Sequence, residues 1–367
     1  MGVIRVLVVD DSVVVRRLVS DALSQAPGVE VVGVAANGRL AQAKVAQLRP
    51  DAVTMDVEMP EMNGIEAVRA LRAAGHKMPI IMFSTLTERG AAATLDALAA
   101  GATDYVAKPS NVGSVQESIA RVADELVPRL RSLVPVPGLA GGVPSTAGRP
   151  VAAAPVAAPR RAVTLRPAPQ PHASRLVVVG SSTGGPEALS RVLSGLTAPP
   201  SVPVLVVQHM PPVFTRQLAT RLDRLGPATV VEAAGGEILQ RGHVYIAPGD
   251  RHLEVRRAGP RLETVLTDGP PVNYCRPAVD VLFRSAVRAV GGDLVAVVLT
   301  GMGSDGRTAC SEVVDAGGTV IVQDEPTSVV WGMPGAVAGA GFAHQVLPIT
   351  EVAPAVERAL QTGGAAA

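Results

Sequence analysis

The chain has 367 residues, enough for two ordinary domains, and 47% of them are hydrophobic, so it can bury two apolar cores and is not disordered throughout. A formal net charge of +1 gives no indication of binding to nucleic acid or to an anionic membrane. The two cysteines, Cys275 and Cys310, cannot form a disulfide framework and lack metal-ligand spacing. Because no apolar run reaches about 18 residues, we expect a cytoplasmic protein without membrane insertion.

The first third of the chain alternates between short apolar runs and amphipathic segments. Runs typical of strands occupy residues 4–10, 29–35, 51–56, 79–85 and 104–109. Helical spacing occurs between them, for example in residues 12–25 and 64–74. This alternation predicts a parallel sheet with helices on both faces.

Polar residues stand where these strands end. Asp10 and Asp11 follow the first strand, Asp56 the third, Ser84 the fourth and Lys108 the fifth. Ligands bind beyond the carboxyl ends of such strands, and three carboxylates at one edge would repel one another without a divalent cation. Oxygen ligands favour Mg²⁺, and Lys108 could pair with an anion attached nearby. Each aspartate taken alone could instead cap a helix or a turn.

The motifs "VDDS", "MDVEMPEMNG", "FST" and "YVAKP" resemble the signature of two-component receiver domains, over about residues 3–125. The resemblance implies a flavodoxin-like (βα)5 receiver domain, which we assign to residues 1–127. In that family the residue that matches Asp56 takes a phosphoryl group from a histidine kinase. The residues that match its Mg²⁺ ligands are Asp10, Asp11, Asp56 and the backbone carbonyl of Glu58.

The same resemblance assigns the residues around the phosphoryl group. Ser84 and Lys108 match residues that contact the phosphoryl oxygens, and Tyr105 matches the aromatic residue that changes rotamer. The Lys108–Pro109 bond is expected to be cis, as in relatives, although most X-Pro bonds are trans. Because phosphorylation places an anionic group beside a cation and a hydroxyl, it can reorder the adjacent face, and we predict that this domain is a switch.

Residues 128–172 separate the two halves of the chain. They are rich in Pro, Ala and Gly and lack the periodicity that buries one face, so we predict a flexible linker. No Asp or Glu lies between Glu125 and Glu187, whereas several arginines do. This basic stretch is either simply solvated or contacts an acidic partner.

After the linker the alternation resumes in a predicted domain of residues 173–362. Strand-like runs occupy residues 175–180, 202–210, 228–234 and 294–302. Residues 252–267 read instead as an antiparallel hairpin that turns at Ala-Gly-Pro. We therefore predict a mostly parallel, doubly wound α/β domain with an added hairpin.

The stretch "VVVGSSTGGPEAL", residues 177–189, places a glycine-rich loop between a strand and a helix. It matches the G-x-S-x-G pattern of a nucleophile, but such loops also hold phosphates, and Ser182 or Thr183 could simply cap the helix. The dinucleotide fingerprint G-x-G-x-x-G is absent. The next strand ends in Gln208 and His209 instead of the acidic residue that would hold a ribose, which favours the nucleophile.

Ser182, His209 and Asp305 all follow predicted strands of this domain, so they are expected at one edge of the sheet. Asp324 also follows a strand and is a rival acid, while Asp305 could merely cap its helix. The chain order Ser, His, Asp differs from that of α/β-hydrolases, which disfavours that fold. The histidines expected to be structural are His243, His252 and His344.

The motifs "GSSTGGPEAL", "VVQHMPP", "YIAPGD", "NYCRPAVDVLF", "TGMGSDG" and "WGMPGAV" resemble the catalytic domain of the CheB family of chemotaxis protein-glutamate methylesterases and glutaminases. The resemblance implies that Ser182 is the nucleophile, His209 the general base and then acid, and Asp305 the residue that orients the imidazole. The implied oxyanion donors are the backbone amides of Thr183 and Met302. The implied substrates are glutamate methyl esters and glutamines of chemoreceptors, and no cofactor is implied in this domain.

Together the two resemblances predict a regulated enzyme of chemotaxis adaptation. We expect the unphosphorylated receiver to block access to Ser182 and phosphorylation of Asp56 to loosen that contact. Three alternatives stay open: a second domain that only binds a partner, a DNA-binding response regulator, and a hydrolase acting on another protein ester. Cys275 and Cys310 are expected to be packing residues, and a monomer is expected because no heptad run occurs.

Overall fold

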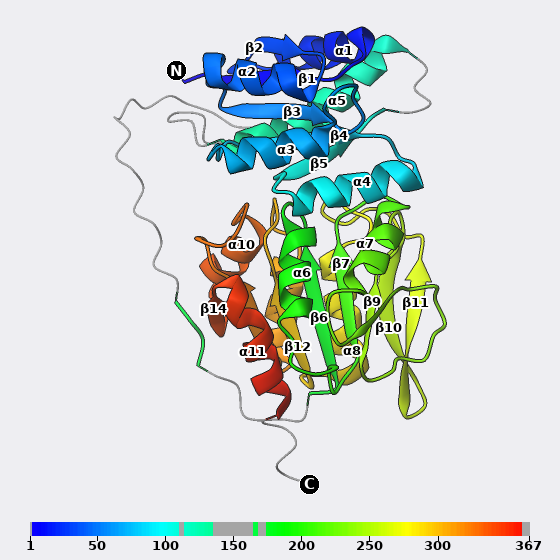
Figure 1. Ribbon diagram of the computed structural model, residues 1–367. Coiled ribbons are helices and arrows are strands. Elements are labelled where there is room, and N and C mark those ends of the chain that lie inside the picture. The colour runs from blue at the N-terminus through cyan, green and yellow to red at the C-terminus, as the bar shows by residue number, and fades with distance from the viewer. Residues whose placement is uncertain (1, 110–113, 135–163, 168–173, 362–367) are drawn as a thin grey trace, which may run out of the picture.

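Alternating strands and helices build two α/β domains, one above the other in the view of Figure 1. The computed structural model describes residues 2–109, 114–134, 164–167 and 174–361. The N-terminal domain lies against the C-terminal domain through its helix α4 (Glu88–Ala99), which contacts α6 (Gly185–Ser194) and α7 (Phe214–Leu222). None of the described helices is long and apolar enough to cross a membrane.

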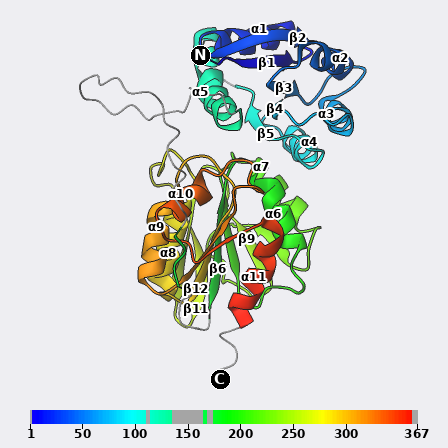
Figure 2. The same cartoon turned by 90° about the vertical axis from the view of Figure 1, so that its left-hand side faces the viewer.

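The N-terminal domain contains a five-stranded parallel sheet with the strand order β2-β1-β3-β4-β5. The strands are β1 (Ile4–Val9), β2 (Val29–Ala35), β3 (Ala52–Asp56), β4 (Ile80–Ser84) and β5 (Asp104–Ala107). The helices besides α4 are α1 (Val13–Ser24), α2 (Gly38–Leu48), α3 (Gly64–Ala73) and α5 (Val115–Leu133). This order, with helices on both faces (Figure 2), confirms the predicted flavodoxin-like fold.

Local sequence explains where these helices begin. Each has an N-cap side chain that accepts a hydrogen bond from a backbone N–H of the first turn, which satisfies a donor that the helix leaves unpaired. The caps are Ser12, Asn37, Asn63, Thr87 and Ser114. At α3 the Glu66 side chain also accepts from the Asn63 backbone, which completes a capping box.

Helix α5 ends later than the expected domain boundary at residue 127, because it continues to Leu133 with Pro128 inside it. Leu126 and Leu130 are fully buried against β1 and α1, so the last turns of the helix belong to the core of the domain. Burial of these side chains offsets the hydrogen bond that Pro128 removes. Residues 135–163 and 168–172 of the predicted linker lie outside the described residues.

The C-terminal domain contains a seven-stranded parallel sheet in the order β14-β13-β12-β6-β7-β9-β8. Its strands are β6 (Leu176–Ser181), β7 (Val204–Gln208), β8 (Thr229–Glu232), β9 (His243–Ile246), β12 (Leu294–Val298), β13 (Thr319–Gln323) and β14 (Gln345–Leu347). Its helices besides α6 and α7 are α8 (Val279–Val290), α9 (Arg307–Asp315), α10 (Met333–Gly339) and α11 (Ile349–Gln361). The separate antiparallel hairpin of β10 (His252–Ala258) and β11 (Arg261–Thr267) confirms the predicted addition.

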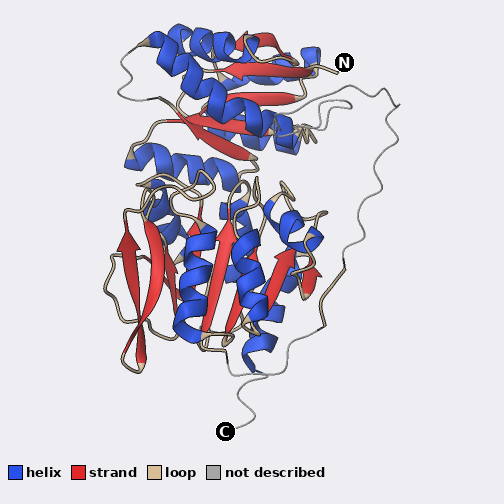
Figure 3. Cartoon of the chain, turned by 180° about the vertical axis from the view of Figure 1, so that it is seen from behind, coloured by secondary structure: helices blue, strands red, loops and turns tan. Residues whose placement is uncertain are grey.

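The strands β12, β6 and β7 lie at the centre of the sheet, and their carboxyl ends face the N-terminal domain (Figure 3). Ligands of open parallel sheets bind at this edge, in the loops that follow the strands. The loops after β6, β7 and β12 carry Ser182, His209 and Asp305, respectively. The fold therefore directs all three candidate residues toward the contact between the two domains.

The late end of α5 makes a testable prediction about the stability of the N-terminal domain. We expect Leu130→Ala to destabilise this domain by about 2–5 kcal/mol, because it removes a buried side chain and leaves a cavity. Ser132→Ala, at an exposed position of the same helix, is the matched control and should change stability by less than about 0.5 kcal/mol. Urea unfolding, monitored by hydrogen exchange of the β1 amides, measures the stability of both variants. Equal stabilities would mean that the domain ends before Leu130.

Candidate active site and phosphoacceptor site

Three carboxylates meet at the carboxyl edge of the N-terminal sheet. Oxygen atoms of Asp10, Asp11 and Asp56 all lie within 4.8 Å of one another, with Asp10 and Asp56 buried and Asp11 exposed. The Nζ of Lys108 lies 2.9 Å from Asp10 Oδ2 and 2.8 Å from Asp56 Oδ1. Such a set of hard oxygen donors fits Mg²⁺, because this ion prefers carboxylate and carbonyl oxygens.

The electrostatics of Asp56 follow from this crowding. Burial raises its pKa, the Lys108 ammonium lowers it, and the negative charge of Asp10 raises it again, so that its pKa reaches about 6. Burial is thus the main reason for the raised pKa of Asp56, and the charge of Asp10 adds to it. A divalent cation beside these carboxylates would favour the ionised form of Asp56.

Ser84 and Glu58, which were also expected at this site, have side chains that contact neighbouring residues. Ser84 is buried, and its hydroxyl donates to the Gly90 carbonyl at 3.2 Å. The Glu58 side chain is exposed and pairs with Arg89 at 3.2 Å. The expectation of a cis bond between Lys108 and Pro109 is wrong, because this bond is trans, the ordinary state of an X-Pro bond. The cis bond of the described residues is Arg276–Pro277.

The loop after β6 is held tightly in the C-terminal domain. The buried Ser181 donates to Gln208 Oε1 at 2.6 Å, and Gln208 Nε2 donates to the Ser182 carbonyl at 2.9 Å. A Cβ at Gly185 would lie 1.9 Å from Gln208 Oε1, and one at Gly301 would lie 2.8 Å from Ser182 Cβ. Glycine is therefore required at both positions, and Gln208 fixes the backbone that presents Ser182.

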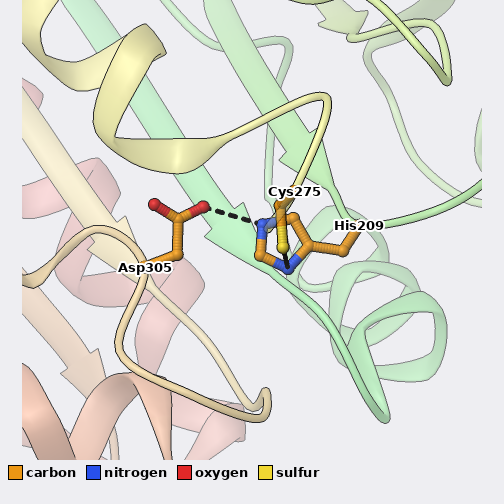
Figure 4. A group of neighbouring side chains, drawn as sticks. All are labelled: His209, Cys275 and Asp305. Carbon is orange, nitrogen blue, oxygen red and sulfur yellow. Dashed lines mark hydrogen bonds and ion pairs between the residues drawn. The ribbon is translucent and has the colours of Figure 1, made fainter. Parts of the chain in front are cut away.

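His209 and Asp305 form a hydrogen-bonded pair beside this loop (Figure 4). His209 Nε2 lies 2.8 Å from Asp305 Oδ2. The same carboxylate accepts hydrogen bonds from the backbone of Val279 at 2.7 Å and from Asn273 Nδ2 at 2.8 Å. These contacts bring together the loops after β7 and β12 and the start of α8.

The pKa values of the pair shift in opposite directions. Burial lowers the pKa of His209, but the hydrogen bonds with Asp305 and Cys275 raise it by more than burial lowers it. The pKa therefore reaches about 9. Burial raises the pKa of Asp305, but His209, the Val279 N–H and Asn273 lower it more. Asp305 therefore stays ionised and stabilises the imidazolium form of His209.

Cys275 contacts His209, although the sequence analysis assigned it to packing. Its Sγ lies 3.6 Å from His209 Nδ1, the ring nitrogen that faces away from Asp305 (Figure 4). No sequence spacing could have indicated this contact, because 66 positions separate the two residues. Within the described residues, the Ser182 hydroxyl makes no hydrogen bond. The partner of His209 Nδ1 is therefore the Cys275 thiol and not the Ser182 hydroxyl.

The structure also places the rival acid, the expected oxyanion donors and the histidines that were expected to be structural. The Asp324 carboxylate accepts from the backbone and the hydroxyl of Thr327, so it closes its own turn and does not contact His209. The backbone amides of Thr183 and Met302 donate to no other described residue, which leaves both available to a ligand. Val320 and Ala278 donate backbone hydrogen bonds to His344 and His252, in keeping with the structural role expected of these histidines.

The N-terminal domain covers this site through β5 and α4. Thr183, next to Ser182, donates its hydroxyl to Asp104 Oδ2 at 2.9 Å. The Tyr105 ring stacks on Phe214, with centroids 4.7 Å apart and an angle of 8° between the planes. A cavity of about 430 Å³ remains between the domains, and His209, Cys275 and Tyr105 are among the residues that line it.

Both domains of the chain resemble known protein families. Residues 177–356 match the CheB methylesterase family, and residues 6–120 match the response regulator receiver domain. The protein-glutamate methylesterase/protein-glutamine glutaminase of Nocardioides sp. is 62% identical over 97% of this chain and 95% of its own length. The protein of the same name from Trichodesmium erythraeum is 42% identical over 96% of this chain and 98% of its own length.

A solved structure supports the fold of the second domain. The crystal structure of the Thermotoga maritima CheB methylesterase catalytic domain is 42% identical, with a TM-score of 0.50, and the match covers 51% of this chain and 98% of that one. The relatives match along almost the whole length of the chain, so both domains and their order are shared. The chain therefore belongs to the CheB methylesterase family and carries a response regulator receiver domain before its catalytic domain.

Proposed function

We propose that this chain hydrolyses glutamate methyl esters and glutamine amides on chemoreceptors, releasing methanol and ammonia, and that phosphorylation of its receiver domain activates it. The observation that carries this proposal is the His209–Asp305 pair beside the loop of Ser182. A histidine kinase is the proposed phosphodonor, and the reaction is placed in the cytoplasm, in chemotaxis adaptation. We propose a monomer that needs no cofactor in its catalytic domain.

In the first half of the reaction, the Ser182 Oγ attacks the carbonyl carbon of the ester or amide. His209 accepts the hydroxyl proton at Nδ1, while Asp305 holds Nε2–H and stabilises the positive ring. The N–H groups of Thr183 and Met302 are free to donate to the oxyanion that forms. His209 then gives its proton to the leaving group, which departs as methanol or ammonia.

In the second half, water hydrolyses the glutamyl ester on Ser182. His209 takes a proton from the water as it attacks and returns it to the Ser182 oxygen as the ester breaks, which frees a glutamate carboxylate. The attack in the first half requires the Ser182 hydroxyl to replace the Cys275 thiol at His209 Nδ1. We therefore infer that the side chains around Nδ1 rearrange before the reaction.

Phosphorylation is proposed to act at Asp56. Asp10, Asp11 and Asp56, with the backbone carbonyl of Glu58, would hold Mg²⁺, which offsets negative charge during phosphoryl transfer. Lys108 lies 2.8 Å from Asp56 Oδ1, within reach of phosphoryl oxygens. Ser84 is the further residue proposed to contact those oxygens.

The contacts between the domains support inhibition of the unphosphorylated chain. Asp104 holds Thr183, and Tyr105 covers Phe214 beside the loop of His209. Lys108 follows directly after β5, so a change at the phosphoacceptor site can reach both contacts through one short strand. We propose that phosphorylation moves Tyr105 and separates the domains.

The nucleophile can be identified by comparing two substitutions. We expect Ser182→Ala to lower methanol release from a methylated chemoreceptor fragment by at least ~10⁴-fold, because the ester can no longer be attacked. Cys275→Ala should retain release, since the thiol is not the proposed nucleophile. Methanol release is measured in the presence of Mg²⁺ and a small-molecule phosphodonor. Loss of release in Cys275→Ala with release retained in Ser182→Ala would assign the attack to the thiol.

The pKa of His209 predicts the pH dependence of the unphosphorylated enzyme. The neutral ring is the active base, and with a pKa of about 9 only about one molecule in a hundred is neutral at pH 7. We therefore expect kcat/KM to rise with pH through an apparent pKa near 9. Cys275→Ala should shift this rise to lower pH, because the thiol contact raises the pKa. The same midpoint in both proteins would contradict the role given to this contact.

The interface can be tested away from the active site. Arg221 Nη1 lies 2.7 Å from Asp96 Oδ1 of helix α4. We expect Arg221→Glu to raise the rate without phosphodonor by roughly two- to ten-fold, since it replaces an exposed ion pair with repulsion. Adding Asp96→Arg should restore the low rate by reversing the pair. A single variant as inactive as the wild type would exclude this surface from inhibition.

A further inference from the structure

The active site holds a pair of side chains that the proposed reaction does not use. Cys275 Sγ and His209 Nδ1 lie 3.6 Å apart at the wall of the cavity between the domains. The nearby Asn273 and Tyr274 have positive φ angles of 52° and 63°, which L-residues rarely adopt. This tight turn sets the backbone that places the thiol against the ring.

The hydrogen bonds of His209 decide which nitrogen carries its lone pair. The ionised Asp305 accepts at Nε2, so in the neutral ring the proton lies on Nε2 and the lone pair on Nδ1. Nδ1, the nitrogen that carries the lone pair, lies 3.6 Å from Cys275 Sγ. A carboxylate behind a histidine in this way also orients and strengthens the histidines that bind metal ions.

The distance between the two atoms fits a shared metal ion. With Zn–N of about 2.0 Å and Zn–S of about 2.3 Å, a tetrahedral ion separates the two ligand atoms by about 3.5 Å. The observed distance of 3.6 Å between Sγ and Nδ1 matches this separation. We propose that His209 Nδ1 and Cys275 Sγ form an inhibitory site for a thiophilic divalent cation such as Zn²⁺.

The chemistry of the donors separates this site from the carboxylates of the receiver domain. Thiolate and imidazole ligands suit Zn²⁺ or Cd²⁺, whereas Mg²⁺ prefers the oxygens of Asp10, Asp11 and Asp56. On binding, the Cys275 thiol and, below its pKa of about 9, the protonated His209 ring each lose a proton to solvent. Water fills the remaining positions of the ion. The cavity of about 430 Å³ lined by both residues gives the ion an approach.

The ion inhibits the proposed reaction because of the atom to which it binds. The metal takes the lone pair of Nδ1, which is the pair that the proposed mechanism uses to accept the proton of Ser182. This consequence rests on the proposed function, but metal binding itself does not. The two are therefore measured separately.

Binding is tested on the full chain, free of affinity tags, with Mg²⁺ in excess and Cd²⁺ as the probe. One equivalent of Cd²⁺ should produce a thiolate-to-metal absorption band in the wild type and in Cys310→Ala, whose thiol is buried elsewhere in the core. The band should be absent in Cys275→Ala. In His209→Ala it should require at least about ten-fold more Cd²⁺. No band in the wild type, or an unchanged titration in His209→Ala, would overturn the site.

Inhibition is tested by titrating Zn²⁺ into the methanol-release assay, with each variant compared with its own rate in a zinc-selective chelator that leaves Mg²⁺ in excess. Zn²⁺ should inhibit the wild type and Cys310→Ala alike, and Cys275→Ala should need at least about ten-fold more. A full Cd²⁺ band together with unchanged release under Zn²⁺ would refute inhibition. Absence of methanol release even in a chelator would instead refute the proposed function, whatever the band shows.

Discussion

The ionised carboxylate of Asp305 is the group on which the active site depends. It accepts hydrogen bonds from the backbone N–H of Val279 and of Gly306, at the starts of helices α8 and α9, and from the side chains of Asn273 and His209. The hydrogen bond with His209 lowers the pKa of the Asp305 carboxyl most, and the N–H groups at the helix starts add to this effect, so the buried carboxylate stays charged. That charge orients the imidazole and determines which nitrogen is free.

The free nitrogen then connects catalysis with its regulation. His209 and Cys275 line a cavity that both domains share, and Cys275 Sγ lies 3.6 Å from Nδ1, the atom that the proposed mechanism pairs with Ser182. The receiver domain holds Thr183 through Asp104, beside the same serine. In the proposed mechanism, both the contact of the receiver domain with Thr183 and the protonated state of His209 must change before the reaction begins.

Much of this architecture follows from local patterns. Apolar runs of strand length, N-cap residues such as Ser12 and Asn63, and polar residues after strands predict the two parallel sheets and the edges at which sites form. The positions of His209 and Asp305 follow in the same way, because parallel strands present their carboxyl ends together. The choice between Asp305 and Asp324 does not follow, since both come after strands and only one reaches the imidazole.

The sequence by itself determined the fold class, the order of the domains and the residues that stand at strand ends, because period and capping act over a few positions. The tertiary structure alone decided the contact of Cys275 with His209 and that of Asp104 with Thr183, whose partners lie 66 and 79 positions apart. It also decided that α5 continues past Pro128, because buried leucines outweigh a lost hydrogen bond. Packing between distant segments sets these features, and no local spacing encodes it.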